Sequence, residues 1–269
     1  MNSIRLYFRY LGISIRSQMQ YRGSFMMMSL GNFAITFIEI IGIWALFARF
    51  HSLGTWGFAD VALFYGMIHI AFAFAEAVGR GFDDRVFSSM IKSGNFDRVL
   101  LRPRSAAFQI AAQEIQLMRI GRLSQGLIVL IWAANTLNLQ WTVFKILLLL
   151  FAIFGGACLF YGLFALHATM VFWSTEALEL MNIFTYGGTE TAQYPLTIYR
   201  SWFRKVFTFI VPLACVTYFP AIAILEKKDV AMNSPLWFQC SAPMIGVIFL
   251  WISLKIWNFG VRHYRSTGS

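Results

Sequence analysis

A few ionisable side chains stand inside apolar stretches long enough to cross a lipid bilayer, among them Glu39, His69, Glu76 and His167. A charge near the middle of a bilayer costs about 2.5–3.5 kcal/mol on insertion scales, so such residues face other helices or a wet cavity. Glu39 lies near the middle of its stretch, which makes it a candidate for a substrate path or a packing contact. Glu76 is expected to pair with Arg80, one helical turn later. For the two histidines, a hydrogen bond between helices is the favoured interpretation.

The familiar catalytic patterns are missing from the sequence. No lysine follows a glycine, which excludes the Gly-x-x-x-x-Gly-Lys-Ser/Thr phosphate loop, and neither His-Glu-x-x-His nor Gly-x-Ser-x-Gly occurs. Asp83 and Asp84 are not followed by the further spaced acids of a metal-dependent lipid transferase. Cys158, Cys215 and Cys240 form no spaced pair, so neither a disulfide nor a zinc site is expected. We therefore expect no catalytic residue, no metal site and no cofactor bound by this chain.

The composition predicts that much of the surface faces something other than water. Of the 269 residues, 58% are hydrophobic and only 13% are charged, about half the charged fraction of a soluble domain. Six apolar stretches have the length of roughly 20 residues needed to cross about 30 Å of hydrocarbon. They are residues 25–47, 61–78, 123–139, 143–173, 206–225 and 238–259. Because they are apolar on every face, they predict an all-α, polytopic membrane protein with six transmembrane helices in one domain, residues 1–269.

The net charge of +10 is distributed in a way that predicts orientation rather than nucleic-acid binding. Eight basic residues lie between the second and third stretches, and others precede the first stretch, precede the fifth (Arg200, Arg204 and Lys205) and follow the last. The opposite side of the predicted bundle carries only Arg49, Lys145, Lys227 and Lys228. The positive-inside rule therefore places both termini in the cytoplasm.

Two segments outside these stretches are predicted to be amphipathic helices. In residues 1–22, apolar residues recur at helical spacing beside an arginine stripe, which is typical of a helix in the headgroup plane; a disordered basic tail is the alternative. Residues 80–104 form a basic loop with a short helix that Ser93-Gly94-Asn95 should end. The apolar face of that helix consists of Phe82, Val86, Phe87, Met90 and Ile91. An inert connector lying on the membrane is the alternative for this loop.

The fourth and fifth stretches carry helix breakers. The fourth is longer than a bilayer requires and is expected to tilt or to project from the membrane, ending at Gly187-Gly188. The fifth contains Pro212 and Pro220, which remove backbone hydrogen bonds and favour kinks. Such breaks occur in transport proteins and in static helices alike. Pro212 and Pro220 join Glu39 and Glu76 as candidate substrate-path residues.

Residues 91–103, 194–199 and 210–221, together with the span pattern, resemble the membrane subunits of type-2 ATP-binding-cassette (ABC) exporters. The likeness covers essentially the whole chain and is strongest to small six-span permeases without a fused ATPase. It implies a cytoplasmic coupling helix seated in a cleft of a separate P-loop ATPase, which carries ATP and Mg. The residues to which the resemblance gives this ATPase-coupling role are Phe82, Asp83, Asp84, Arg85, Val86, Phe87, Met90, Ile91 and Lys92.

The resemblance further implies two permease chains, as a homodimer or a heterodimer, assembled with two ATPase chains in a bacterial cytoplasmic (inner) membrane. ATP binding would press on the coupling helices and rock the spans, moving a drug, lipid or other amphiphile outward. The family's long outer loop with re-entrant helices is expected to be short in this chain. Two other classes stay open: an enzyme acting on lipid through Glu39, Glu76 or the histidines, and a membrane scaffold that transports nothing.

Overall fold

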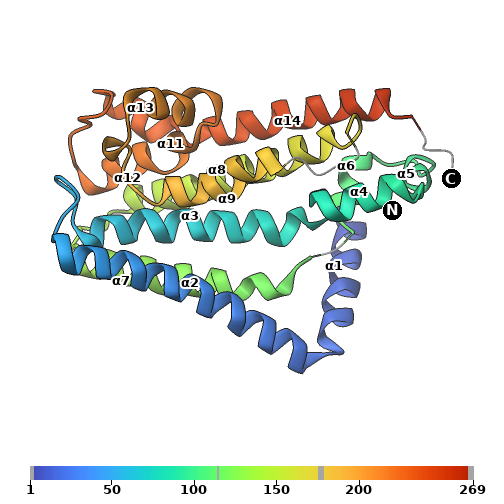
Figure 1. Ribbon diagram of the computed structural model, residues 1–269, viewed down its shortest axis with the longest axis horizontal. Coiled ribbons are helices and arrows are strands. Elements are labelled where there is room, and N and C mark those ends of the chain that lie inside the picture. The colour runs from blue at the N-terminus through green and yellow to red at the C-terminus, as the bar shows by residue number, and fades with distance from the viewer. Residues whose placement is uncertain (1–2, 114, 175–178, 266–269) are drawn as a thin grey trace.

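The computed structural model describes residues 3–113, 115–174 and 179–265, and these residues form helices with no strand beyond one isolated bridge. Five helices of this described part are long and apolar enough to cross a membrane. They are α2 (Arg22–Phe50), α3 (Phe58–Gly79), α7 (Ile120–Thr136), α8 (Val143–Met170) and α14 (Met244–His263). They run lengthwise in one bundle (Figure 1). The chain is an all-α polytopic membrane protein, as the sequence predicts.

The two ends of the bundle carry different structures (Figure 1). One end, termed the basic end, carries α1 (Ser3–Met19), the short helices that follow α3, and the last turn of α14. At the other, termed the far end, α2 leads into α3 and α7 leads into α8. Helix α1 runs across the long helices, which fits the interfacial position expected for residues 1–22. Hydrogen bonds hold it in place: among them, the Ile115 N–H donates to Ser14 Oγ at 3.2 Å, and the Leu117 N–H donates to Gln18 Oε1 at 3.1 Å.

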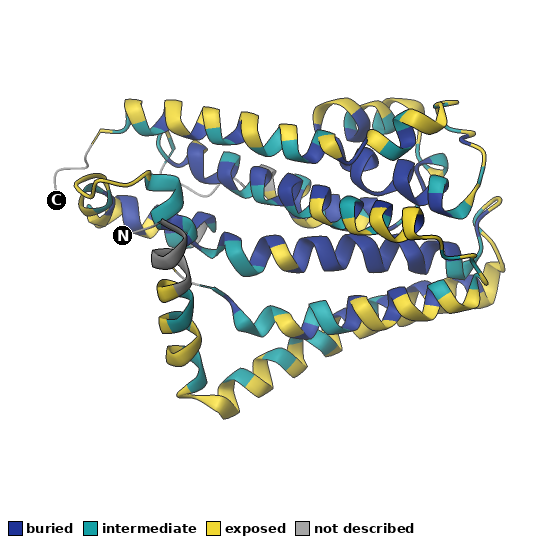
Figure 2. Ribbon diagram, turned by 180° about the vertical axis from the view of Figure 1, so that it is seen from behind, coloured by how far each residue is buried: buried dark blue, intermediate teal, exposed yellow. Residues whose placement is uncertain are grey.

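Helix α3 is the centre of the bundle. It is buried along almost its whole length, whereas α2 and α14 expose their outward faces (Figure 2). It packs against both α7 and α8. A Cβ atom on Gly66 would collide with the backbone of Leu130, so this glycine is what permits the close approach of α3 and α7. Small residues are common between the helices of membrane bundles because they let the helix backbones approach closely. Polar side chains on α3 are therefore within reach of several neighbouring helices.

The fifth crossing of the bundle is made by α9 (Glu179–Ala192) and the 3-10 turn η3 (Leu196–Ile198), not by residues 206–225. Contacts between this segment and α3 or the turn before it progress from the basic end to the far end. They are Tyr186–Glu76 at 3.3 Å, Gln193–His69 at 3.5 Å and Thr197–Trp56 at 2.9 Å. This segment therefore runs antiparallel to α3. The expectation that Gly187-Gly188 ends a helix was wrong, because both glycines lie inside α9.

Residues 201–225 form a bent segment at the far end. Helix α10 (Ser201–Lys205) continues into a π-helical turn, η4 (Val206–Ile210), and the chain then bends by 73° into α11 (Leu213–Val216) and α12 (Tyr218–Leu225). Just after this segment, Lys227 pairs with Asp60 in the first turn of α3. The segment starts and ends at the far end, so it is re-entrant. Pro212 lies at the bend, as expected of a residue without an N–H, whereas Pro220 lies in the first turn of α12, where proline is tolerated.

Candidate functional site

A chain of polar side chains crosses the middle of the bundle from α2 through α3 to α9. The Tyr65 hydroxyl donates to the Thr36 carbonyl at 2.8 Å and lies 3.4 Å from Glu39 Oε2. The Tyr65 and His69 rings stack with centroids 3.9 Å apart. His69 Nε2 lies 3.9 Å from Glu39 Oε2 and 3.5 Å from Gln193 Oε1. These side chains define the mid-bundle network.

The network reaches the surface at both of its ends. Gln193 Nε2 donates to Glu190 Oε2 at 2.7 Å, and Glu190 is exposed on α9. The side chain of Glu39 is 30% exposed, while that of His69 is 2% exposed. Carboxylates at this depth are too costly to face hydrocarbon, so they require water, a substrate or another chain beside them. Of the candidate substrate-path residues, Glu39 is the one that the structure places in such a position.

Glu76 belongs to a separate, buried cluster nearer the basic end. Its carboxylate lies 3.2 Å from Arg119 Nη2 and 2.9 Å from Arg122 Nη1, and it accepts a hydrogen bond from the Tyr186 hydroxyl at 3.3 Å. The expected pair with Arg80 was wrong, because Arg80 pairs with Asp83 at 3.1 Å. Glu76 is only 5% exposed. Its contacts tie α3 to α7 and α9, and a place on a substrate path stays a prediction for this residue.

The loop after α3 folds into short helices around an aromatic core. Its elements are η1 (Arg80–Phe82), α4 (Asp84–Lys92), α5 (Asn95–Leu100) and α6 (Ala106–Ala111). Helix α4 ends as predicted, with Gly94 in the left-handed region at φ 67°. Trp257 of α14 lies 4.9 Å from Phe82, 5.1 Å from Phe87 and 6.4 Å from Phe96, measured between ring centroids. Phe172, just after α8, completes the core.

This core covers the apolar face of α4, which the sequence predicts to contact a partner. The side chains of Phe82, Phe87, Met90 and Ile91 are all buried inside the chain's own fold. Within the chain, these four side chains therefore pack against α8 and α14, and contact with an ATPase through them stays a prediction. Of the other coupling candidates, Asp83 and Val86 are half-buried and Lys92 is exposed. The side chains of Asp84 and Arg85 lie outside the described part of the structure.

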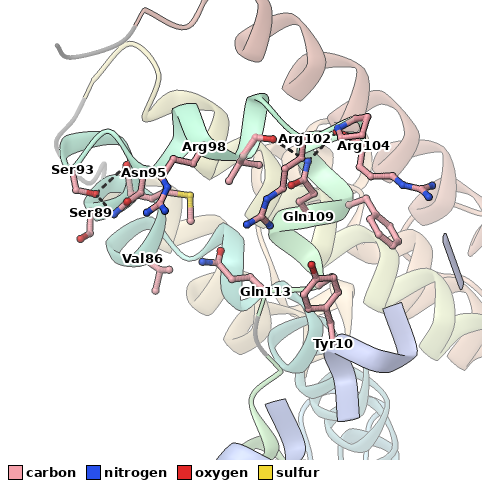
Figure 3. A pocket seen from close by; sticks show the side chains of 15 residues that line it. Tyr10, Val86, Ser89, Ser93, Asn95, Arg98, Arg102, Arg104, Gln109 and Gln113 are labelled. Atoms are coloured by element: carbon pink, nitrogen blue, oxygen red, sulfur yellow. Dashed lines mark hydrogen bonds between the residues drawn. The ribbon is translucent and has the colours of Figure 1, made fainter. Parts of the chain in front are cut away.

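The outward surface of the same loop was not found from the sequence. Leu101 is 86% exposed, an extreme value for a leucine beyond the end of the bundle, and Ser89 and Lys92 are exposed on α4. Beside them is a hollow of about 700 Å³, termed the basic hollow, between the loop and Tyr10 of α1. Figure 3 shows Arg98 and Arg102 directed into it, with Gln113 and Tyr10 on the opposite wall. Tyr10 is distant in sequence from the loop, so no local pattern predicts this hollow.

Some of the charges at the far end have partners within the chain, whereas Arg49 and Lys228 are exposed without a side-chain partner among the described residues. Lys227 Nζ lies 2.5 Å from Asp60 Oδ2 and 4.5 Å from the centroid of the Trp56 ring, and Lys145 Nζ lies 2.7 Å from Glu226 Oε1. These contacts fix the outer loop against α3 and α8.

Asp229 organises the outer loop before α13 (Leu236–Ser241). Its carboxylate accepts hydrogen bonds from the Tyr218 hydroxyl and from the N–H groups of Ala231, Met232 and Ser234, at 2.9–3.1 Å. Burial by itself would raise the pKa of Asp229, but the hydrogen bonds from Ser234, Met232 and Tyr218 outweigh it and hold this pKa below its usual value.

No group of three or more His, Cys, Asp or Glu side chains in the described ranges is placed to hold a metal ion. The three cysteines are free thiols. The arrangement that remains is a membrane bundle with a polar network across its middle and a basic, partly apolar surface at one end.

The sequence matches the family model described as ABC-2 family transporter protein over residues 33–268. This match covers most of the chain, so the chain belongs to that family and is a permease component of an ABC-type transporter. No match was found among curated proteins or among solved structures.

Proposed function

We propose that this chain is the membrane subunit of an ABC exporter, paired with a second permease chain and driven by a separate P-loop ATPase that binds ATP and Mg. Its substrate would be a drug, lipid or other amphiphile moved out of the cell, and its location would be a bacterial inner membrane with both chain termini in the cytoplasm. Family membership supports the permease assignment. The direction, the partners and the substrate class are the parts that we add.

The mid-bundle network is the observation that carries this proposal. Glu39 and Glu190 are partly or fully exposed, although their helices are among those that cross the bundle. Lipid alone cannot solvate two carboxylates at this depth. A water-containing path between two permease chains can, because each chain would place its own Glu39 and Glu190 along the shared space. Glu39 is thus proposed as a substrate-path residue, whereas Glu76 holds the helices that form the wall.

Coupling to the ATPase is proposed to use the outward surface of the loop: Ser89, Lys92 and Leu101. Leu101 is available for such a contact because its apolar side chain is 86% exposed. The aromatic core behind this surface gives the contact a mechanical consequence. Because Phe87 packs against Trp257, a displacement of α4 would move α14 as well instead of being lost in a flexible loop.

Co-purification with the ATPase tests the proposed coupling surface. A tagged full-length chain, extracted in mild detergent from its own host, should carry a P-loop ATPase in stoichiometric amount, identified by mass spectrometry. Leu101→Asp should remove the ATPase. Val230→Asp should not, since Val230 is 77% exposed but lies in the loop at the far end. Recovery of the chain alone, or equal retention by both variants, would contradict the coupling surface.

Thiol labelling tests the proposed path. In a Cys240→Ser background, Glu39→Cys and Glu190→Cys should react with a small membrane-impermeant maleimide in intact membranes, because water reaches them. Ile252→Cys serves as the control, since Ile252 is 44% exposed on the apolar outward face of α14. Equal protection of all three cysteines would place Glu39 and Glu190 in a dry environment and remove the path.

A further inference from the structure

The basic hollow contains two arginines whose charges nothing in the described chain neutralises. Arg98 and Arg102 are exposed, and neither guanidinium has an ion pair or hydrogen bond within the described part of the structure. The whole segment 80–104 holds six basic residues against three acidic ones. Elsewhere in the molecule, the membrane-level arginines 119 and 122 share the carboxylate of Glu76. The absence of such a partner in the hollow points to an anion from outside the chain.

The lining of the hollow is chemically mixed. Figure 3 shows the guanidinium groups of Arg98 and Arg102 turned into the same space, with the Gln113 amide and the Tyr10 hydroxyl facing them. Val86, Met90 and Phe108 add apolar surface to the wall. The volume of about 700 Å³ lies within the range of pockets that hold small organic ligands. A ligand suited to this lining has an anionic group, hydrogen-bonding oxygens and an apolar part.

The position of the hollow identifies the source of such a ligand. One wall is Tyr10 of α1, the helix that runs across the bundle at the level of its basic end (Figure 1). Helix α1 leaves Ile13 59% exposed and Ile15 36% exposed, as a helix in the headgroup plane does. Arginine clusters at this level bind the phosphates of anionic lipids, because the guanidinium matches phosphate geometry and the leaflet is negatively charged.

We propose that the basic hollow holds the phosphate group of an anionic membrane lipid, with Arg98 and Arg102 as its charged donors and Gln113 and the Tyr10 hydroxyl as its hydrogen-bonding wall. The acyl chains would lie along the exposed apolar residues of α1. The bound lipid would link α1 to the loop that carries α4 and α5. This inference needs only the membrane position of the chain and does not rest on an ATPase partner.

Lipid titration of the purified full-length chain tests the proposal. Short-chain dioctanoyl phosphatidylglycerol, dioctanoyl phosphatidylcholine, glycerol 3-phosphate and inorganic phosphate are each added to the protein in a neutral detergent, and binding is followed by native mass spectrometry. One arginine near an anionic membrane surface contributes about fivefold to affinity, so the two arginines together should make phosphatidylglycerol bind at least about tenfold more tightly than phosphatidylcholine. Each of Arg98→Gln and Arg102→Gln should weaken phosphatidylglycerol binding by about fivefold.

Arg262→Gln is the matched control, because Arg262 is an exposed arginine of the basic end that does not line the hollow. It should leave lipid binding unchanged, and thermal unfolding should show that all three variants keep the fold. Equal binding of the two lipids, or unchanged binding by Arg98→Gln and Arg102→Gln, would overturn the site. Glycerol 3-phosphate binding as tightly as phosphatidylglycerol would assign the hollow to a soluble phosphate and overturn the lipid. Exclusion of phosphatidylglycerol by a co-purified ATPase would assign the hollow to that partner instead.

Discussion

The loops at the two ends of the bundle differ in how their charged side chains are held. At the far end, Lys227 pairs with Asp60, Lys145 pairs with Glu226, and Asp229 accepts hydrogen bonds within its own loop. At the basic end, an aromatic core is closed, while Arg98 and Arg102 have no side-chain partner among the residues that the structure describes. The outer loop at the far end is thus held by contacts of the chain itself, although Arg49 and Lys228 are exposed there, whereas the hollow at the basic end is proposed to be completed by a bound lipid.

The comparison separates residues that hold the fold from residues that are free to bind. A side chain that is buried and partnered must be unpacked before it can contact another molecule, and this unpacking costs free energy. An exposed, unpartnered side chain can do so at little cost. The four predictions that follow use stability measurements in detergent to sharpen this division.

Phe87→Ala is expected to have the largest effect, a loss of about 3–5 kcal/mol in the free energy of unfolding. The reason is that Phe87 is fully buried against Trp257, Phe96 and Phe172. Thermal unfolding and expression level in the membrane fraction measure it. Ser89→Ala on the exposed face of the same helix should change stability by less than about 0.5 kcal/mol. Equal stability of the two variants would mean that α4 does not pack against α14.

Glu76→Gln is expected to cost about 3–5 kcal/mol, because it leaves two largely buried arginines without their carboxylate. The change is nearly isosteric, so the loss reflects charge rather than volume. The double variant Glu76→Gln/Arg122→Gln should recover part of the stability, since it removes one of the two unpaired charges. An undiminished melting temperature for Glu76→Gln would show that water reaches this cluster.

Asp229→Asn is expected to cost about 1.5–3 kcal/mol, the range for hydrogen bonds to a charged acceptor. Because the pKa of Asp229 is lowered by folding, its stabilising effect is fully present above the unfolded pKa of about 3.9 and is lost as the pH falls through the folded value. The stability gap between the native chain and Asp229→Asn should therefore be constant near neutral pH and close in acid. A gap that does not change with pH would assign the loss to geometry alone.

Glu226→Gln should have the smallest effect, about 0.2–1 kcal/mol, although its carboxylate lies 2.7 Å from Lys145. The side chain of Glu226 is 76% exposed, so water replaces the lost contact. Raising the salt concentration should lower the stability of the native chain slightly and leave the variant unchanged. A loss as large as that of Glu76→Gln would contradict the division between buried and exposed pairs.

The sequence predicts the helices more reliably than it predicts which side chains contact one another. The long apolar stretches become helices because hydrocarbon leaves the backbone no other way to form its hydrogen bonds, and Gly94 ends α4 because it accepts a left-handed conformation. The fifth crossing was missed because α9 is short, carries Glu190 and is followed by Gln193, so it lacks the apolar signal of a span. Residues 206–225 have that signal but bend back at Pro212.

The sequence by itself determined the class of the protein: an all-helical membrane permease with basic residues concentrated at one end. Composition and helix length suffice for that, since both are local properties of the chain. Only the tertiary structure decided what each polar or aromatic side chain contacts. In the folded chain, the apolar face of α4 packs against Trp257, and Glu76 pairs with Arg119 and Arg122 instead of Arg80. Tyr10 lies on the wall of the hollow opposite Arg98. An amphipathic sequence shows only that one face of a helix is buried. Whether that face is buried by the chain itself or by a partner depends on how distant segments pack.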